Sequence, residues 1–329
     1  KYWDIKEFGT LDLPSIEDYR DKIMGLLKDS ISIQKRSDVA VGTFLSGGID
    51  SSCIVALLSE QLEEPVRTFS AGFEGGLNEL PYARMVAGKF VTDHTELMIK
   101  GSELPSVIPE IIGMMDEPIS DNSIVPTYML SKVAVNCGVK VVLNGTGGDE
   151  LFGGYERYIP RTVIRKAVNS LPGKFRKKIG SLVSIVDLDK GVKLENHALL
   201  FAASISGVNY TFLRKLFKDK TNYERILDDV IERYKRFVPG CKKEVSKSHL
   251  MYFDLKNYLV GDVLSLLDKM TMGVSLEGRV PMLDHRVVEL CYSVPDSVKF
   301  RNGKLKGLLK STLQGVLPDE IMHLPKSGF

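Results

Sequence analysis

The sequence has no strong excess of charge, no long apolar run and no closely spaced cysteines. Its 44 basic and 42 acidic residues leave a net charge of +2, whereas a dedicated nucleic-acid-binding surface usually comes with a clear basic excess. No apolar run approaches the roughly 18 residues that a membrane span needs, and the start shows no basic-then-apolar signal segment. We therefore expect a cytoplasmic protein that binds neither nucleic acid nor membrane.

Cysteine and histidine are too scattered to indicate a zinc site or a disulfide framework. The four cysteines, Cys53, Cys137, Cys241 and Cys291, include no CxxC pair, and the five histidines show no ligand spacing. This usage is typical of reduced thiols, most of them buried. A chain of 329 residues with 43% hydrophobic residues can build a sizeable core and is long enough for about two domains.

Helix and strand patterns alternate through the first half of the chain. Residues 15–36 have the apolar spacing of an amphipathic helix that begins with a capping-box-like pair, Ser15 and Asp18. The expected strands are 39–46, 66–73, 94–99 and 139–145, and the further expected helices are 50–63, 78–90, 104–116 and 124–138. Strands separated by helices of this length predict an α/β fold, a parallel twisted sheet with helices on both faces.

The pattern changes beyond about residue 151. Strand signals become rare and helical spacing dominates, as in residues 248–272. We therefore expect an α/β core over residues 15–158, followed by a mainly helical region over residues 159–329. The basic stretch 160–200 is interpreted as a solvated helical face.

The stretch FLSGGIDSS, residues 44–52, follows an expected strand and opens an expected helix. In open parallel sheets this is where ligands bind. Gly47 and Gly48 let the backbone approach an anion closely, and the helix N-terminus favours negative charge. Asp50 would repel a bare phosphate, which suggests a role in holding Mg²⁺. The lysine of the Walker loop is absent, which favours a loop that grips the departing end of a nucleotide.

A second glycine-rich loop, LNGTGGDELFGGYERY at residues 143–158, follows another expected strand. Asp149 and Glu150 place carboxylates at the same edge of the predicted sheet. Asp50 and Asp149 could therefore share one Mg²⁺ on a triphosphate. The alternative is that both carboxylates only cap helices.

These loops carry a resemblance. SGGIDSS resembles the pyrophosphate loop of the N-type ATP pyrophosphatases, and the second loop resembles the SGEGGDELFGGY signature of glutamine-dependent asparagine synthetases. Four further segments agree with that family, in the family's order: TFSAGF (68–73), DEPISDNSIVPTY (116–128), DKMTMGVSLEGRVPMLDHRVVEL (268–290) and RNGKLKGLLK (301–310). The resemblance implies an adenine nucleotide alpha hydrolase-like fold, with ATP and Mg²⁺ as cofactors. It also implies two steps: a carboxylate attacks the α-phosphorus and releases pyrophosphate, and ammonia then displaces AMP.

The resemblance also implies roles for particular residues. Lys306 corresponds to the family's catalytic lysine, with Thr146 and Asp149 as further catalytic positions and Asp50 and Asp149 as metal ligands. The implied ATP- and pyrophosphate-binding residues are Phe44, Leu45, Ser46, Gly47, Gly48, Asp50, Ser51, Ser52, Ala71, Asn144 and Gly145. Asp121 and Ser123 are expected to face the acyl substrate, and Asp268 and Lys269 to line the pyrophosphate side, with helix-surface or core-edge roles as the alternative. Arg279 and Asp284 are interpreted as structural ion-pairing residues in a loop.

The chain departs from the family pattern in its second loop. Thr146 stands where asparagine synthetases usually carry Glu, and Asn144 replaces the usual Ser. The resemblance extends to β-lactam synthetases, which have also lost this Glu. The leading interpretation is an asparagine-forming synthetase, and the alternatives are another amide ligase or a non-catalytic ATP-binding domain. Against the last stand Asp50, Asp149 and Lys306, which are all present.

The ends of the sequence suggest a longer protein. Residues 1–14 look like the tail and linker of an N-terminal glutaminase domain. The sequence has no cysteine before Cys53, so it does not contain the N-terminal nucleophile of such a domain. The final LPKSGF resembles a family stretch after which relatives continue. The expected partners are a small-molecule carboxylate, ammonia and, in an intact chain, a glutaminase domain, while a homodimer is left open.

Overall fold

The computed structural model describes residues 2–6, 8–75, 78–117, 121–158, 217, 219–237 and 246–324. Its contacts divide the chain into two units, one formed by Lys1–Gly154 with Leu259–Phe329 and the other by Tyr155–Tyr258. This division is not contiguous, unlike the expected split after residue 158, because the last part of the chain returns to the sheet. Outside the described residues lie the basic stretch 160–200, Cys241 and all but the first residue of the final LPKSGF.

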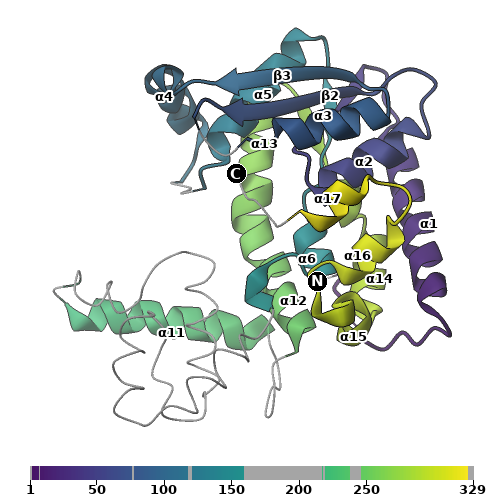
Figure 1. Cartoon of the computed structure of the whole chain (residues 1–329). Coiled ribbons are helices and arrows are strands. Elements are labelled where there is room, and N and C mark those ends of the chain that lie inside the picture. Colours follow the sequence, from purple (N-terminus) through teal and green to yellow (C-terminus); the bar gives the residue numbers. More distant parts are fainter. Residues whose placement is uncertain are drawn as a thin grey trace. The chain divides into compact units, whose positions relative to one another are not determined.

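The first unit is built on a five-stranded parallel sheet (Figure 1). The strands are β1 (Val41–Phe44), β2 (Arg67–Phe73), β3 (Asp93–Ile99), β4 (Val141–Leu143) and β5 (Glu277–Arg279), in the order β3-β2-β1-β4-β5. Since the order reverses at β1, the β1–β4 junction is the point where open α/β sheets bind their ligands. The predicted fold class is confirmed.

The strand β5 was not expected from the sequence. Its three residues, Glu-Gly-Arg, are too short and polar to carry a strand pattern, and the sequence predicts a loop here. Pairing with β4 is the reason that they are extended, with Leu143 opposite Arg279. The Arg279 guanidinium pairs with Glu277 at 2.7 Å and donates to the Gln34 carbonyl at 2.6 Å, which confirms its structural role.

The expected helices form, with ends shifted by a few residues. In the first half they are α1 (Ile16–Gln34), α2 (Ile49–Ser59), α3 (Leu80–Lys89), α4 (Leu104–Met114) and α5 (Ile124–Asn136). The short α6 (Gly148–Phe152), within the second glycine-rich loop, was not expected. Later come α11 (Lys220–Phe237), α12 (Lys247–Lys256), α13 (Ser265–Met272), α14 (His285–Ser293), α15 (Asp296–Lys299), α16 (Gly307–Thr312) and α17 (Asp319–His323). A π-helical turn, η3 (Leu259–Leu264), interrupts the helix expected over 248–272. Across the described ranges, no helix combines the length and apolarity needed to cross a membrane.

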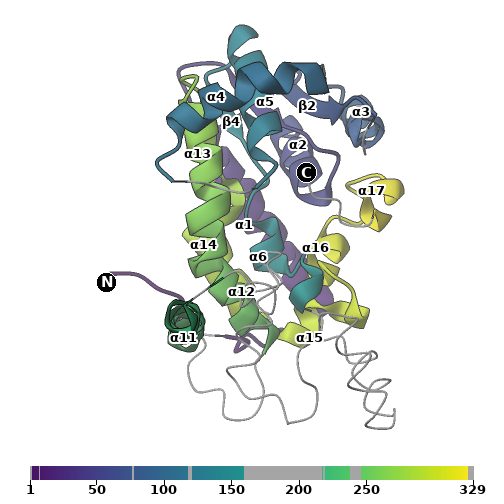
Figure 2. The ribbon, with the colours of Figure 1, turned by 90° about the vertical axis from the view of Figure 1, so that its left-hand side faces the viewer.

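The two faces of the sheet are covered by different helices (Figure 2). On one face Leu130 and Ala134 of α5 and Leu267 of α13 pack against Phe69 and Val142 of the sheet. The helix α2, which follows β1, is buried along nearly its whole length, with every residue from Cys53 to Leu58 at 0% exposure. The first turn of α2 is therefore fixed by the core, and so is the loop that leads into it.

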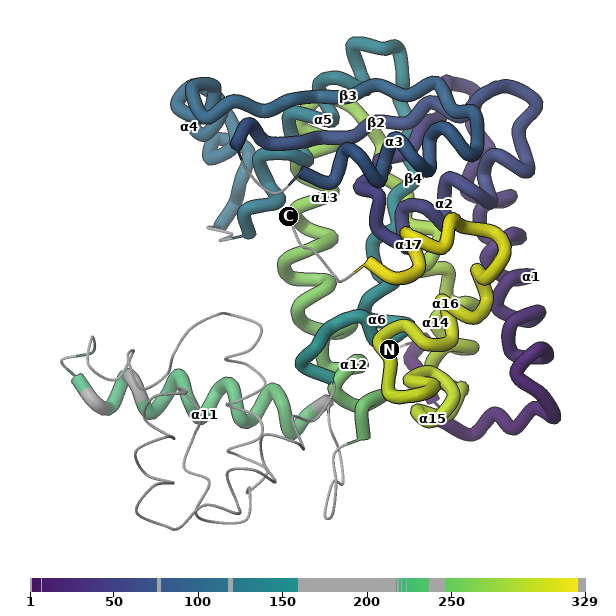
Figure 3. Tube along the Cα trace, viewed as in Figure 1, coloured from purple at the N-terminus to yellow at the C-terminus, as the bar shows by residue number. Residues whose placement is uncertain are grey.

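The helix α1, near the start of the chain, packs against segments from its end. Ser15 and Asp18 form the predicted capping box, and Ile23, Leu27 and Ile31 are buried at helical spacing. The helices α14 and α16, from the end of the chain, lie against α1 (Figure 3). The buried Ser30 hydroxyl donates to the Pro281 carbonyl at 2.7 Å. This packing brings the C-terminal segment back beside the sheet.

The second unit contains α11 and α12 among its described residues. A buried polar contact of this unit lies at Asp254, which is fully buried on α12. The Asp254 carboxylate accepts from Arg157 Nε at 2.8 Å and from the Tyr158 hydroxyl at 2.5 Å. The buried charge is therefore compensated within the unit.

A lysine is buried in the first unit. Lys299 on α15 is at 0% exposure, its nitrogen lies 5.3 Å from the centre of the Tyr292 ring, and the nearest Asp296 oxygen is 3.9 Å away. Burial outweighs the Asp296 charge and lowers the pKa of Lys299 from 10.5 to about 8. The folded chain therefore binds this proton less tightly than the unfolded chain does.

This buried lysine predicts a pH dependence of stability. Between about pH 8 and pH 10.5 the unfolded state holds more protons than the folded state at Lys299, so the free energy of unfolding should rise with pH, by up to about 3 kcal/mol. Lys299→Met should remove this contribution, and its stability relative to the parent should be greatest near pH 7. Denaturant titrations from pH 7 to 10.5 measure the difference, with Lys304→Met at an exposed site as the control. Equal slopes for all three proteins would contradict the assignment.

Candidate active site at the sheet edge

The two glycine-rich loops leave neighbouring strands at the same edge of the sheet. β1 and β4 are paired in parallel, with Thr43 opposite Leu143, so the chain after each strand enters the same region. The loops touch directly. A Cβ built on Gly145 would lie 2.7 Å from the Asp50 carbonyl carbon and from the Ser51 amide nitrogen. The predicted convergence of the loops is thus observed.

A lysine from the end of the chain joins the two loops. The Lys306 ammonium donates to Asp50 Oδ2 and lies 2.7 Å from Asp149 Oδ1. Asp50 is in the first turn of α2, Asp149 is in the first turn of α6, and Lys306 immediately precedes α16. The helices α6 and α16 lie side by side (Figures 1 and 2). Three segments that are far apart in the sequence therefore meet at one cation.

The electrostatics and the backbone of Lys306 are unusual. The residue is 7% exposed. Burial alone would lower the pKa of its ammonium, but the charges of Asp149 and then Asp50 outweigh this effect and raise the pKa above its usual value. The residue also has a left-handed backbone with φ +52°, a conformation that costs a side-chain-bearing residue of order 1–2 kcal/mol. A strained backbone of this kind persists only where surrounding contacts hold it, and it is typical of functional sites.

Two glycines allow this close approach. A Cβ on Gly148 would lie 2.5 Å from Asp50 Cγ, and a Cβ on Gly154 would overlap with Asp149 Oδ1 and Lys306 Cε. Both glycines belong to the second glycine-rich loop, and their local sequence gives neither a role. Their function follows from packing between elements, which no local pattern reports.

The two carboxylates form a donor set that fits Mg²⁺. Both oxygens reach a single cationic nitrogen, so they converge on one point. Within the described part of the chain no group of three or more His, Cys, Asp or Glu side chains is placed to hold a metal ion. Mg²⁺ is commonly held by one or two protein carboxylates together with waters and substrate phosphates. The pair therefore suits an ion that arrives with a polyphosphate.

The first loop is closed on itself by hydroxyl groups. The Ser46 amide donates to Ser51 Oγ at 3.2 Å, the two hydroxyls are 3.0 Å apart, and Ser51 Oγ donates to the Gly48 carbonyl at 3.1 Å. Gly48 also donates its N–H to Ser46 Oγ at 3.3 Å. The internal hydrogen bonds hold the loop in shape before a ligand binds. A bound phosphate would accept hydrogen bonds from the same hydroxyl and N–H groups.

Several residues implied by the resemblance face the core. Phe44, Leu45, Ala71 and Ser52 are at most 8% exposed, and Phe44 and Ala71 belong to the same hydrophobic cluster. Their side chains are therefore packed inside the protein. If they contact a nucleotide, the contact comes from their backbone groups.

The two substituted positions of the second loop bond to each other. Asn144 Oδ1 accepts from the Thr146 amide at 2.9 Å and from the Thr146 hydroxyl at 2.7 Å. The Asn144 amide nitrogen of the backbone donates to the Arg279 carbonyl of β5 at 2.8 Å. Asn144 and Thr146 therefore form one neutral unit, held at the β4–β5 edge.

The remaining predicted residues contact other parts of the chain, and none of these contacts reaches Asp50, Asp149 or Lys306. Asp121 Oδ1 accepts from the Ser123 amide at 2.8 Å, just before α5 begins. Lys269 pairs with Asp116 at 2.5 Å, and Asp268 is exposed. Asp284 caps α14 and pairs with Arg286 at 2.8 Å, as expected of a structural residue.

A further carboxylate, which the sequence analysis did not single out, is Asp262. Asp262 lies in the π-helical turn η3, and such turns are frequent at functional sites. Burial and then the Asp121 charge raise its pKa, which places the two carboxylates within electrostatic reach. No spacing in the sequence links residues so far apart.

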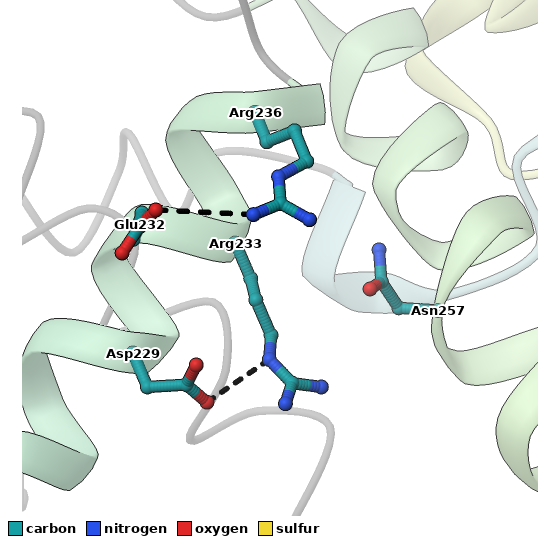
Figure 4. Close-up of a pocket in the computed structure, with 5 residues that line it drawn as sticks. All are labelled: Asp229, Glu232, Arg233, Arg236 and Asn257. Atoms are coloured by element: carbon teal, nitrogen blue, oxygen red, sulfur yellow. Dashed lines mark ion pairs between the residues drawn. The ribbon is translucent and has the colours of Figure 1, made fainter.

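A pocket in the second unit does not resemble an active site (Figure 4). It encloses about 310 Å³ and is lined by Asp229, Glu232, Arg233, Arg236 and Asn257. Arg233 pairs with Asp229 at 2.9 Å and Arg236 lies 3.8 Å from Glu232, both one helical turn apart on α11. These are exposed pairs of the kind that lie on many helix surfaces.

A model of the asparagine synthase family matches residues 22–329. The chain is 32% identical to asparagine synthetase [glutamine-hydrolyzing] 1 of Bacillus subtilis, over 95% of this chain and 49% of that protein. A putative asparagine synthetase [glutamine-hydrolyzing] of Mycobacterium tuberculosis is also 32% identical, over 94% of this chain and 47% of its own length. The chain thus spans about half the length of these relatives.

Similarity to other proteins is more distant. Amidase chry2 of Gibberella zeae is 22% identical, with 100% of this chain and 55% of that protein covered. Among solved structures, an NH3-dependent NAD synthetase of Campylobacter jejuni matches with a TM-score of 0.29 and 15% identity, over 70% of this chain and 100% of that chain.

The glycine contacts predict how the site can be disrupted without touching a charge. Gly154→Ala should force Asp149 and Lys306 apart and lower the free energy of unfolding by about 1–3 kcal/mol. Gly88→Ala is the matched control, because a Cβ there meets nothing within 4 Å and should be neutral or slightly stabilising. Denaturant titration measures both. A Gly154→Ala protein as stable as the parent would contradict the described packing.

Proposed function

This chain belongs to the asparagine synthase family, and we propose that it is the synthetase part of an ATP-dependent, AMP-forming amide synthetase. The observation that carries the proposal is the convergence of Asp50, Asp149 and Lys306 at the ligand-binding edge of a parallel sheet. The proposed substrates are ATP, a carboxylic acid, with the aspartate side chain first, and ammonia. The products are the amide (asparagine for aspartate), AMP and pyrophosphate.

The first step makes an acyl-adenylate. A carboxylate oxygen of the acid attacks the α-phosphorus of ATP, the bond from that phosphorus to the bridging oxygen breaks, and pyrophosphate leaves with the bond electrons. The loop at Ser46–Ser52 offers hydroxyls and backbone N–H groups to the leaving pyrophosphate. Asp50 and Asp149 would hold Mg²⁺, which neutralises charge on the phosphates. The Lys306 ammonium supplies a fixed cation near the developing charge.

The second step forms the amide. The nitrogen of ammonia attacks the acyl carbon, and the bond from that carbon to the AMP oxygen breaks. The Thr146 hydroxyl is not a base near neutral pH, so Thr146 does not accept the proton that ammonia loses. In the full-length protein we propose a glutaminase domain as the ammonia source. This is supported by the names of the relatives and by the share of their length that the chain spans.

The second loop favours an additional candidate function. Where asparagine synthetases usually carry Glu, Thr146 is bonded to Asn144 in a neutral unit. A neutral unit neither repels an anionic group nor pairs with a cationic one. The same adenylation chemistry could therefore serve a different acid or amine, as in a β-lactam-synthetase-like ligase. A distant relative at 22% identity carries another name, Amidase chry2.

Pyrophosphate release tests the function. The full-length protein is incubated with MgATP and ammonia, and with no acid, aspartate or a panel of other carboxylic acids. We expect pyrophosphate and AMP in equal amounts with the correct acid, and asparagine if that acid is aspartate. Release only with another acid would support the second candidate. Nucleotide binding without release for any acid would contradict both.

The role of Lys306 has its own prediction. Lys306→Met should lower the rate of pyrophosphate release by about 100-fold or more, since a fixed cation at the developing charge is lost. Lys310→Met, on α16 and outside the ion pair, is the matched control and should stay within a few-fold of the parent. The rates are measured at saturating MgATP. Equal rates for the two variants would contradict the assignment.

The Thr146 position can be tested by reversal. Asn144→Ser/Thr146→Glu restores the residues usual in asparagine synthetases. If the neutral unit selects a different substrate, this variant should gain aspartate-dependent pyrophosphate release relative to the parent. The ratio of kcat/KM for aspartate and for the best other acid gives the readout. An unchanged ratio would show that the two positions do not determine the acid.

A further inference from the structure

The site formed by Asp50 and Asp149 already contains a cation, which is part of the chain. The Lys306 nitrogen donates to Asp50 Oδ2 and is 2.7 Å from Asp149 Oδ1. The formal charges of the three groups sum to −1. The proposed function places a divalent ion at the same two carboxylates, so the Lys306 ammonium and the divalent ion would compete for them.

The backbone crowds the ion pair of Lys306 with Asp50 and Asp149 on two sides. On one side the backbone of Gly148 approaches Asp50 so closely that a Cβ would lie 2.5 Å from Asp50 Cγ. On the other side a Cβ on Gly154 would overlap with Asp149 Oδ1 and Lys306 Cε. A Mg²⁺ ion bonds its oxygen ligands at about 2.0–2.1 Å and retains several waters. The Lys306 nitrogen already contacts Asp50 Oδ2 and Asp149 Oδ1, so a Mg²⁺ ion can bond these two oxygens together only after the ammonium has moved.

A free divalent ion has little to gain from that exchange. It would have to displace an ammonium that is tethered to the site, and it would leave a 7%-exposed Lys306 without its carboxylate partners. A polyphosphate changes this balance, because its oxygens offer the displaced ammonium new acceptors. The left-handed backbone of Lys306, at φ +52°, shows that the present position is held by contacts at some cost.

We propose that the Lys306 ammonium occupies the Asp50–Asp149 site and excludes a free divalent ion. Mg²⁺ enters only together with a polyphosphate, whose oxygens replace the two carboxylates as acceptors for the ammonium. The inference rests on the proposed function for the identity of the polyphosphate. It goes further by giving Lys306 a role before any reaction. The same movement carries the ammonium from the carboxylates to the phosphates, where it is needed in the reaction.

The proposal makes Mg²⁺ and polyphosphate bind cooperatively. Since coupling between two ligands is reciprocal, each must raise the affinity for the other by the same factor. Inorganic pyrophosphate is the simplest probe, because it needs neither an acid substrate nor turnover. A protein with no synthetase activity could still show this coupling.

The test is a calorimetric titration of the full-length protein with Mg²⁺ alone and with pyrophosphate, with and without Mg²⁺. For the parent we expect no saturable Mg²⁺ binding at the two carboxylates in the absence of pyrophosphate, and pyrophosphate affinity at least about tenfold higher with Mg²⁺. Lys306→Met should bind Mg²⁺ alone at least about tenfold more tightly than the parent does. Lys310→Met, which leaves the ion pair in place, should behave like the parent.

Stability gives an independent readout. Lys306→Met leaves two neighbouring carboxylates without their ammonium, so Mg²⁺ alone should raise its melting temperature but not that of the parent. Asp149→Asn, which keeps Lys306 on Asp50, replaces Lys306→Met if that variant does not fold, and should gain no Mg²⁺ binding. Tight Mg²⁺ binding to the parent without pyrophosphate would overturn the proposal, whichever variant folds. The same holds if Lys306→Met gains no Mg²⁺ affinity. Either result leaves the synthetase function untouched, because that function is judged by pyrophosphate release.

Discussion

The contact of Lys306 with Asp50 and Asp149 is the interaction on which the rest of the site depends. It joins a helix buried in the core, a glycine-rich loop after the next strand, and a segment more than 150 residues further along the chain. The backbone of each aspartate is fixed: Asp50 lies on the buried α2, and the Asp149 main-chain carbonyl accepts from the Gly153 and Gly154 amides at 3.0 and 2.9 Å. The position of the lysine depends in turn on α1, which packs against α16 and is bonded to the Pro281 carbonyl through Ser30. The fold is thus arranged so that the first and last parts of the chain meet at one charge.

The same constraint explains which features the sequence predicts. The helices expected in the first half and the longer strands have periodic apolar residues and form where that pattern indicates, whereas η3 interrupts the helix expected over 248–272. The strand β5 has no such pattern, because its three residues are extended only through pairing with β4. The non-contiguous division of the chain into two units likewise rests on contacts between distant segments. Contacts between distant segments leave no trace in local composition.

The site shows a similar division. Asp50 and Asp149 follow from their places after two strands of a parallel sheet, which any reader of the sequence can locate. In the sequence, Lys306 could be singled out only by resemblance to a family, because the residues around it do not distinguish it from Lys304 or Lys310. The roles of Gly148 and Gly154 needed the structure, because they depend on which side chains lie opposite. So did the bonds between Asn144 and Thr146, which turn two separate substitutions into one neutral unit.

The central claim is that the acid attacks the α-phosphorus, and isotope transfer tests it most directly. The acid substrate is labelled with ¹⁸O in its reacting carboxylate, and the products of one turnover with ammonia are examined by mass spectrometry. The account predicts one ¹⁸O atom in AMP, because the acyl oxygen that bonds to phosphorus stays with AMP when the amide forms. Transfer of ¹⁸O to inorganic phosphate, with ADP as the other product, would contradict it.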